Sequence, residues 1–288
     1  IRQAMPTASY DDPQTNALSH EYVYAALAEA VAEAGIDDVV TAFDVGTHQM
    51  KGAQWFPVSR PRSFVTSGGM GSMGCAIPMA VGASYARPEA TVLAFAGDGG
   101  FVMSSHELDT IGGYGIPVKI VLFDDAALGM VGNWHGLFFG GRNLTSDRRR
   151  GRSVLPTDVA GLKDLLRGRL ERAGSADDVA AALCEATAEL AQGEWPFFAA
   201  AAASYGIPAE RVHTKAHLYA AVRRALAAPG PYLVHVALPA QNQVYPLMEP
   251  GATPQEMVWR ETYPGSGERV YARERFDYEA RCLRPTDE

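Results

Sequence analysis

The chain alternates between short apolar runs and longer segments whose apolar residues recur with helical spacing. The runs have the length of buried parallel strands, and most segments between them have room for one helix. We expect strands at 39–43, 64–66, 92–96, in the run ending at Asp124, and at 232–238, and helices at about 19–35, 75–85, 101–114, 128–134, 197–205 and 215–227. This alternation predicts an α/β protein with a three-layer, doubly wound and mostly parallel sheet.

Composition narrows the class of protein. With 288 residues and 47% apolar content, the chain can bury one substantial core. We expect a soluble, cytoplasmic protein with no membrane partner, because no apolar run approaches the roughly 18 residues of a membrane span and no leader opens the chain. The net charge of −8 argues against nucleic acid. Cys75, Cys184 and Cys282 have no metal-ligand spacing and fit a reducing compartment.

The main chemical signal is a pair of acidic turns that follow two apolar runs. Gly97-Asp98-Gly99-Gly100 follows the run at 92–96, and Asp125 lies 27 residues beyond Asp98, at the end of the next run. Because ligands of open α/β sheets bind outside the carboxyl ends of strands, both carboxylates should face one crevice and could hold a hard cation. Glycines let the backbone approach a bulky anion, and a helix starting near Phe101 would direct N–H groups at it. We therefore expect a magnesium-bound phosphate ester.

The stretch from Gly97 to Arg142 closely resembles the thiamine-diphosphate motif of the acetolactate synthase catalytic subunit family. The matching segments are Gly97-Asp98-Gly99, Glu107-Leu108-Asp109-Thr110, Pro117-Val118-Lys119, Leu128-Gly129-Met130-Val131 and Trp134. Further matches are Val45–Met50, Thr66–Gly74, Tyr205–Ala209, Gly230–Leu233 and Val244–Met248. The resemblance covers about residues 18–145 and 197–258.

The resemblance implies the diphosphate-binding domain of a thiamine-diphosphate enzyme with Mg²⁺, and no FAD held by this chain. It implies that Asp98, Asp125 and the carbonyl of Ala127 ligate the metal. Residues implied to contact the cofactor are Thr47, His48, Gly71, Ser72, Met73, Gly97, Asp98, Gly99, Gly100, Asp125, Ala127, Leu128, Gly129 and Met130. Met130 and Trp134 would line the substrate pocket. Met73, Met130 and Trp134 could instead be core residues, and His48 a hydrogen-bonded turn residue.

The catalytic glutamate of this family comes from a separate pyrimidine-binding domain, for which this chain has no room upstream of Ser19. We expect either half of a split enzyme or a fragment of a longer chain. In the split case, a subunit with a pyrimidine-type domain completes a hetero-oligomer, which we expect to be a heterotetramer. The domain itself should span 18–258, between an arm or linker at 1–17 and a C-terminal extension at 259–288.

The sequence departs from the family in two ways. A block at about 144–195, with helices expected at 159–172 and 176–192, replaces a shorter connection. It is either a surface excursion, which costs little at a loop, or a lid or docking element at the mouth of the site. In addition, Asp124-Asp125 stands where the family has Asn-Asn, which adds negative charge beside a polyanionic cofactor.

Three functions remain open at this stage. The first is an acetolactate-synthase-like carboligase subunit, a transferase that moves a decarboxylated 2-oxo acid unit, as from pyruvate, to a carbonyl acceptor. The second is a 2-oxo acid decarboxylase subunit that releases an aldehyde. The third is a non-catalytic scaffolding chain with an altered metal turn.

Overall fold

The computed structural model describes residues 17–58, 60–138, 198–239 and 244. Residues 1–16 of the expected arm, the expected insertion at 144–195 with its two helices, and the expected extension at 259–288 all lie outside these ranges. The prediction of their structure therefore stays untested.

A single parallel sheet forms the centre of the described structure. Its strands are β1 (Val39–Phe43), β2 (Phe64–Thr66), β3 (Thr91–Gly97), β4 (Lys119–Asp124), β5 (Ala209–Val212) and β6 (Tyr232–Ala237), in the spatial order β2-β1-β3-β4-β6-β5. Each of the five pairings is parallel. The central strands are buried on both faces, as expected for a parallel sheet covered by helices.

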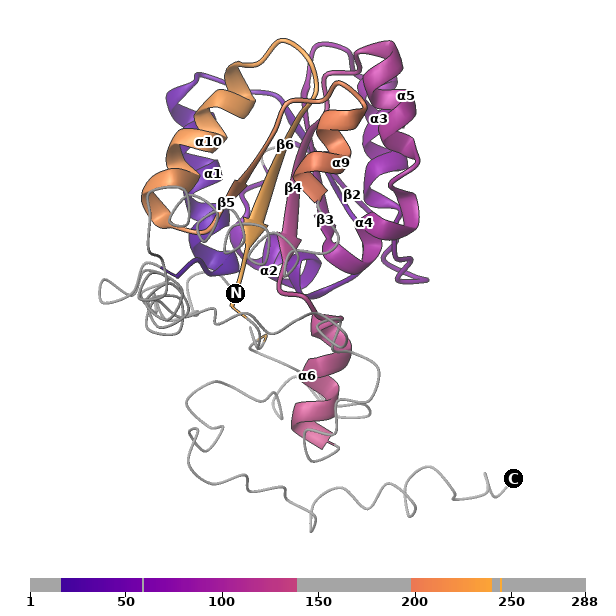
Figure 1. Ribbon diagram of the computed structural model, residues 1–288, viewed down its shortest axis with the longest axis vertical. Helices are drawn as coiled ribbons and strands as arrows, with labels where there is room; N and C mark the ends of the chain where they lie inside the picture. Colours follow the sequence, from indigo (N-terminus) through magenta and orange to yellow (C-terminus); the bar gives the residue numbers. More distant parts are fainter. Residues whose placement is uncertain (1–16, 59, 139–197, 240–243, 245–288) are drawn as a thin grey trace, which may run out of the picture.

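Helices cover both faces of the sheet and confirm the three-layer α/β prediction (Figure 1). One apolar core joins the sheet to α1 (His20–Glu33) and α10 (Lys215–Ala227), and α2 (Thr47–Trp55) lies on the same side. The opposite core joins the sheet to α3 (Ala76–Ala86), α4 (Asp98–Ser104), α5 (Glu107–Tyr114) and α9 (Phe198–Ser204). The remaining described helix, α6 (Gly129–Phe138), leaves the carboxyl edge of the sheet after β4.

Local sequence explains where α1 begins and what it buries. The side chain of Ser19 accepts a hydrogen bond from the Tyr22 amide at 3.1 Å, which satisfies one of the N–H groups that a helix start leaves without a partner. Val23, Leu27 and Ala30 then recur at helical spacing and are buried against the sheet. Gly35, at φ 64°, follows the helix end in the left-handed conformation that glycine adopts most readily.

The prediction of one crossover helix at 101–114 is wrong, as is its start near Phe101. The structure has two helices, and the first begins at Asp98 itself, directly after β3. Between them, the amides of Leu108 and Asp109 bond to carbonyls three residues back, a tighter turn than that of an α-helix. Apolar spacing alone did not reveal this break.

Two elements were not predicted from the sequence. The helix α2 follows Gly46 without a side-chain cap, so its start carries no capping signal. The strand β5 is four residues long, includes Glu210 and Arg211, and pairs only with β6 at the sheet edge. Both elements lack the apolar pattern on which the prediction depended.

The sheet topology places a crevice between β1 and β3. The chain continues from β1 to β2 on one side and from β3 to β4 on the other, so the segments that follow β1 and β3 lead apart at the carboxyl edge. Within the described ranges, none of the helices combines the length and the apolar content that a bilayer crossing requires.

Candidate functional site

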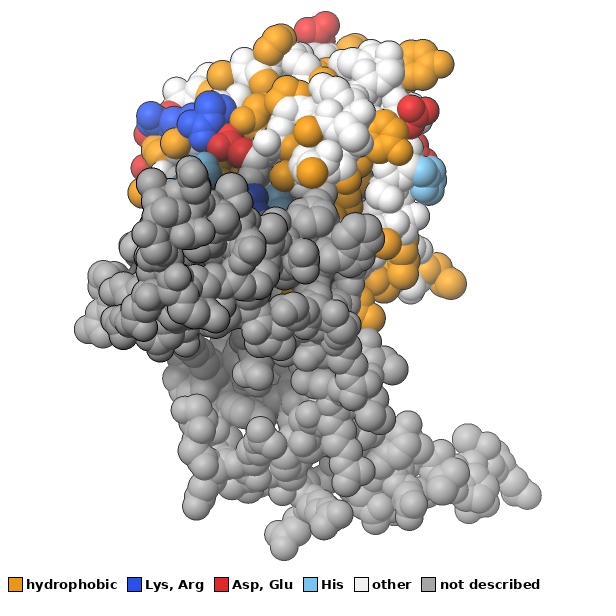
Figure 2. Space-filling model, viewed as in Figure 1, with side chains coloured by type: hydrophobic (Ala, Val, Ile, Leu, Met, Phe, Trp, Pro, Cys, Tyr) orange, Lys and Arg blue, Asp and Glu red, His pale blue; other side chains and the backbone are white. Residues whose placement is uncertain are grey.

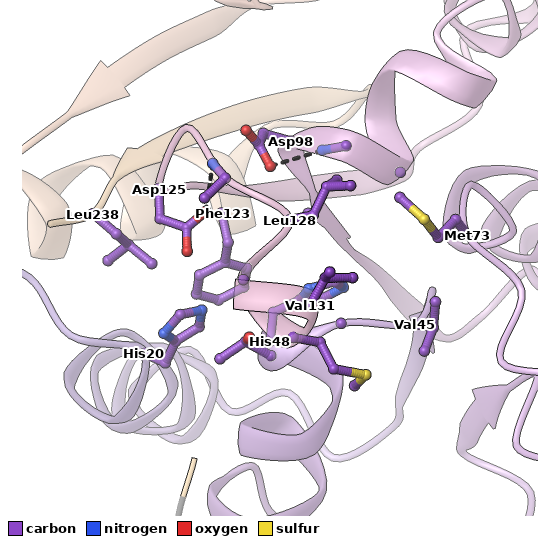
Figure 3. Close-up of a pocket in the computed structure, with 18 residues that line it drawn as sticks. His20, Val45, His48, Met73, Asp98, Phe123, Asp125, Leu128, Val131 and Leu238 are labelled. Atoms are coloured by element: carbon purple, nitrogen blue, oxygen red, sulfur yellow. Dashed lines mark hydrogen bonds between the residues drawn. The ribbon is translucent and has the colours of Figure 1, made fainter. Parts of the chain in front are cut away.

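A cleft of about 110 Å³ opens at the carboxyl ends of β1, β3 and β4 (Figure 3). It is lined by His20, Val45, Gly46, Thr47, His48, Met73, Gly97, Asp98, Gly99, Gly100, Phe123, Asp125, Ala127, Leu128, Gly129, Met130, Val131 and Leu238. The two turns singled out in the sequence therefore meet in one cavity. Asp98 and Asp125 come from adjacent strands, β3 and β4, which are in register from Leu93–Lys119 to Gly97–Phe123.

The first acidic turn joins β3 directly to α4. Asp98 is the first residue of the helix, is 2% exposed, and accepts a hydrogen bond from the Gly99 amide at 2.7 Å. Gly100 packs so closely on the loop after β1 that a Cβ there would lie 1.6 Å from Oδ2 of Asp44. A side chain at position 100 would therefore displace the Asp44 carboxylate.

The second acidic turn separates its two aspartates. Asp124 Oδ2 accepts from His235 Nε2 at 2.8 Å and its Oδ1 accepts from the Ala126 amide at 3.0 Å, whereas Asp125 lines the cleft. Asp125 Oδ1 accepts from the Ala127 amide at 3.1 Å. The bonds from the Ala126 and Ala127 amides hold the turn. Within it, Ala126 has φ 54°, an unusual conformation for a residue with a side chain.

Burial sets the charge state of Asp125. The pKa of Asp125 is raised to about 6, mainly because burial removes hydration from the carboxylate. The charge of Asp124 also raises this pKa, while the hydrogen bond from the Ala127 amide and the charge of His48 lower it. The carboxylate thus carries its charge at neutral pH at a cost in stability. A cation in the cleft would offset this cost.

Thr47 shows that the cleft has unmet hydrogen-bonding capacity. Its Oγ1 is buried and has no hydrogen-bond partner among the described residues. A Cβ added to Gly129 would lie 2.8 Å from this atom and 2.9 Å from Oδ2 of Asp125. Glycine at the start of α6 therefore lets the helix approach the hydroxyl and the carboxylate together.

Several residues at the cleft were not predicted as site residues, and two of them, His20 and Asp44, are buried and polar. His20 opens α1, is 2% exposed, and stacks on Phe123 with ring centroids 5.0 Å apart. Burial lowers its pKa well below the ordinary value, and the charges of His48 and Lys51 add to this effect. Its position at a helix start gave no signal in the sequence.

Asp44 lies beneath the cleft and bonds His48 Nε2 at 2.6 Å. Its signal was present in the sequence, because Asp44 follows β1 as Asp98 follows β3. His48 itself lies in α2 and not in a turn.

Similarity to known proteins agrees with this geometry. Residues 44–193 match the family model described as "Thiamine pyrophosphate enzyme, C-terminal TPP binding domain". The chain belongs to this family. The resemblance to thiamine-diphosphate enzymes inferred from the motifs is thereby confirmed.

Curated relatives of this TPP-binding domain are acetolactate synthases. The chain is 34% identical over 221 residues to the acetolactate synthase isozyme 2 large subunit of Escherichia coli, covering 77% of this chain and 32% of that protein. It is 44% identical over 121 residues to the acetolactate synthase large subunit of Lactococcus lactis, covering 42% of this chain and 20% of that protein. The chain thus spans about a third or less of these relatives.

A solved structure shows the same fold. The thiamine diphosphate-dependent 4-hydroxybenzoylformate decarboxylase of Rhodococcus jostii aligns with a TM-score of 0.52 at 20% identity, covering 79% of this chain and 34% of that one. At this identity the similarity concerns the fold alone.

Three residues expected at the TPP site do not line the cleft: Gly71, Ser72 and Trp134. Gly71 and Ser72 lie in the preceding turn, where the carbonyl of Ser72 accepts from the Val45 amide at 3.1 Å. Met73, next in the chain, does line it. Trp134 lies on α6, beyond Met130.

The expected magnesium ligands of the TPP-binding domain are all oxygen atoms. No group of three or more His, Cys, Asp or Glu side chains suited to a metal occurs among the described residues. The expected magnesium ligands include only two such side chains, Asp98 and Asp125, with the carbonyl of Ala127 as the third. The chemistry of this donor set fits a hard cation bound jointly with phosphate oxygens.

Proposed function

We propose that the chain is the diphosphate-binding half of a thiamine-diphosphate-dependent, acetolactate-synthase-like carboligase. The observation that carries the proposal is the placement of Asp98 and Asp125 in one cleft at the carboxyl edge of the sheet. The curated relatives, named acetolactate synthases, support this chemistry. The reaction would move a decarboxylated unit of a pyruvate-like 2-oxo acid to a carbonyl acceptor.

The residues of the cleft fit the cofactor. Asp98, Asp125 and the Ala127 carbonyl would hold Mg²⁺, and the Gly97–Gly100 turn would lie against the diphosphate. The buried Thr47 hydroxyl would gain a partner from the bound diphosphate or its metal shell. When bound, thiamine diphosphate supplies a nucleophilic carbon and an electron sink for decarboxylation.

The remaining residues would position and enclose the reactants. His48 would face the diphosphate, and Met73 would support the bent cofactor while backbone groups of Gly71 and Met73 bond its aminopyrimidine. Met130, which lines the cleft, would limit the size of the acceptor, and Trp134, four residues further along α6, would do so beyond the cleft. Apolar residues line much of the cleft, which would exclude water around the reacting carbonyl.

The proposal requires a second domain. We expect a pyrimidine-type domain, carried by a partner subunit or by another part of a longer chain, to supply the activating glutamate. Met70 and Met103, 88% and 58% exposed, support a partner near the cleft, because Met103 packs against Gly74, next to Met73. We further predict that the chain assembles into a hetero-oligomer, specifically a heterotetramer, and that it is cytoplasmic.

Calorimetric titration tests the proposed function. Thiamine diphosphate with Mg²⁺ is titrated into the full chain, alone and in complex with the polypeptide that co-purifies with it. We expect binding in the complex, followed by a ligated product when pyruvate and a carbonyl acceptor are added. Release of aldehyde without ligation would replace the carboligase with a decarboxylase, and absence of cofactor binding in the complex would contradict the proposal.

A further inference from the structure

Asp44 is a buried carboxylate that joins three segments around the cleft. It follows β1 and is fully buried. Its Oδ1 accepts from His48 Nε2 at 2.6 Å and from the Gly97 amide at 3.3 Å, and its Oδ2 accepts from the Gly74 amide at 3.0 Å. One side chain therefore ties the start of α2, the end of β3 and the turn before α3.

The surrounding chain is shaped to admit this carboxylate. A Cβ at Gly100 would overlap Asp44 Oδ2, so position 100 must lack a side chain. Asp44 itself does not line the cleft, whereas its partners His48 and Gly97 do. Its effect on a ligand would thus pass through these neighbours.

The hydrogen bond to Asp44 determines which ring nitrogen of His48 can contact a ligand. Because Nε2 donates to Asp44, Nδ1 is the ring nitrogen left to face a ligand. Cβ atoms added to Gly46 and Gly97 would lie 2.7 and 3.1 Å from Nδ1, so this nitrogen lies directly against the glycine turn that precedes Asp98. The hydroxyl of Tyr24 fixes the other end of the residue by donating to the His48 carbonyl at 2.7 Å.

We infer that Asp44 is a positioning residue for the diphosphate site, which orients the His48 ring and fixes the Gly97 and Gly74 amides before the ligand binds. The inference rests on the proposed function. Fixing donors in advance lowers the cost of ordering them on binding, so the loss of Asp44 should weaken diphosphate affinity more than it weakens the fold.

The variant Asp44→Asn tests this inference because it keeps the shape of the side chain. An amide has one acceptor oxygen, so at least one of the three donors loses its acceptor. The matched control is Glu21→Gln, which weakens the ion pair between Lys51 and Glu21 that holds the same helix α2 against α1. This control reports on a loosened α2 with Asp44 intact.

Two readouts separate positioning from general destabilisation. The first is the Kd for Mg²⁺ with thiamine diphosphate and, separately, with inorganic diphosphate, measured on the full chain in its complex. We expect a rise of about tenfold or more in Asp44→Asn and less than about threefold in Glu21→Gln. The second is the imidazole N–H spectrum of ¹⁵N-histidine protein, in which His48→Gln assigns the His48 signal. A protected Nε2–H signal should be present in the wild type and unchanged in Glu21→Gln, and it should be shifted or lost in Asp44→Asn, because a neutral amide replaces the charged acceptor.

The outcomes distinguish this inference from the proposed function. If the wild type binds neither ligand, the proposed function is overturned and the role of Asp44 in diphosphate binding falls with it. If the wild type binds and Asp44→Asn binds equally well with an unchanged His48 signal, only the inference is overturned. Should Asp44→Asn fail to fold, Asp44→Glu replaces it, because this variant keeps the charge but moves it by one methylene. A folded Asp44→Glu with unchanged affinity would equally overturn the inference.

Discussion

Asp124 and Asp125 are neighbours in the chain but lie in different environments. Asp124 pairs with His235, and both side chains are largely buried, while Asp125 faces the cleft. The sequence raised the concern that two carboxylates beside a polyanion would repel it. In the structure only Asp125 lines the cleft, whereas Asp124 is hydrogen-bonded to His235. One carboxylate, and not two, would therefore face the polyanion.

Replacing Asp125 with Asn should stabilise the metal-free chain at neutral pH. Its pKa of about 6, raised by burial, lies above the ordinary 3.8, so the folded state is penalised above pH 6 and the penalty fades as the pH falls from 6 to 4. The shift corresponds to a gain of about 1–3 kcal/mol for Asp125→Asn at pH 7.5. Urea denaturation of both proteins at pH 7.5 and pH 4.5 measures it.

The same variant should keep its affinity for the cofactor or improve it, because an amide oxygen still ligates Mg²⁺ without adding charge. A gain in stability that is as large at pH 4.5 as at pH 7.5 would refute the electrostatic explanation. Complete loss of cofactor binding would show that the ligand was wrongly assigned.

At the residue scale, the sequence identified most of the cleft through its motifs. The acidic turns and Thr47, His48 and Met73 line the cleft, and their contact with a cofactor stays a prediction. His20 could not be found from spacing, because it acts through its contact with Phe123 on a distant element. Asp44 follows β1 as Asp98 follows β3, but its bonds to Gly74 and Gly97 depend on distant elements that spacing does not report.

At the scale of elements, α5 contains two adjacent glycines in opposite settings. A Cβ at Gly112 would lie 2.1 Å from the carbonyl oxygen of Tyr205, whereas a Cβ at Gly113 meets nothing within 4 Å. Gly112 thus lets α5 approach the end of α9, whereas Gly113 packs against none of the described residues.

These settings predict opposite effects of one substitution. Gly112→Ala should destabilise the protein by about 1–3 kcal/mol through overpacking against backbone, while Gly113→Ala should stabilise it by about 0.5–1 kcal/mol through helix propensity. Thermal and urea unfolding of the two variants measure both. Equal effects at the two positions would contradict the packing of α5 described above.

The apolar pattern predicted most of the described elements, including the edge strand β2 and the helices α6 and α9, and failed for α2, β5 and the division between α4 and α5. The strands β1, β3, β4 and β6 and the helices α1, α3 and α10 lie close to their expected positions. The break between α4 and α5 and the helix α2 depend on hydrogen bonds and contacts with neighbouring elements, which periodicity does not report.

For the whole molecule, the buried His20 links stability to pH. Burial keeps the pKa of His20 well below 6.5 in the folded chain. Below pH 6.5, His20 is therefore protonated in the unfolded chain while it stays neutral in the folded chain. Stability from this residue is therefore complete above pH 6.5 and declines as the pH falls, by at most about 1.4 kcal/mol per pH unit.

The substitution His20→Asn should remove this decline. The difference in unfolding free energy between wild type and His20→Asn should shrink from pH 7.5 to pH 5.5, as measured by urea titration at each pH. His106→Asn is the control, because the His106 side chain is 75% exposed. A difference that stays constant with pH for His20→Asn would contradict the assignment of a neutral buried imidazole.

The fold class followed from the alternation of strands and helices, but the extent of the functional unit did not. The chain spans about a third or less of its acetolactate synthase relatives. Apolar side chains lie on part of the described surface (Figure 2), and Met70 and Met103 are among the exposed ones. The proposed pyrimidine-type domain would contribute further residues to the site, and the spacing of residues in the TPP-binding domain carries no information about them.

A crystal structure of the assembled complex with thiamine diphosphate and Mn²⁺ in place of Mg²⁺ tests the proposed metal site most directly. We expect an anomalous manganese peak between Asp98, Asp125 and the carbonyl of Ala127, with the diphosphate against Gly99 and Gly100. A manganese peak elsewhere, or a cleft without cofactor in the complex, would contradict the proposed site.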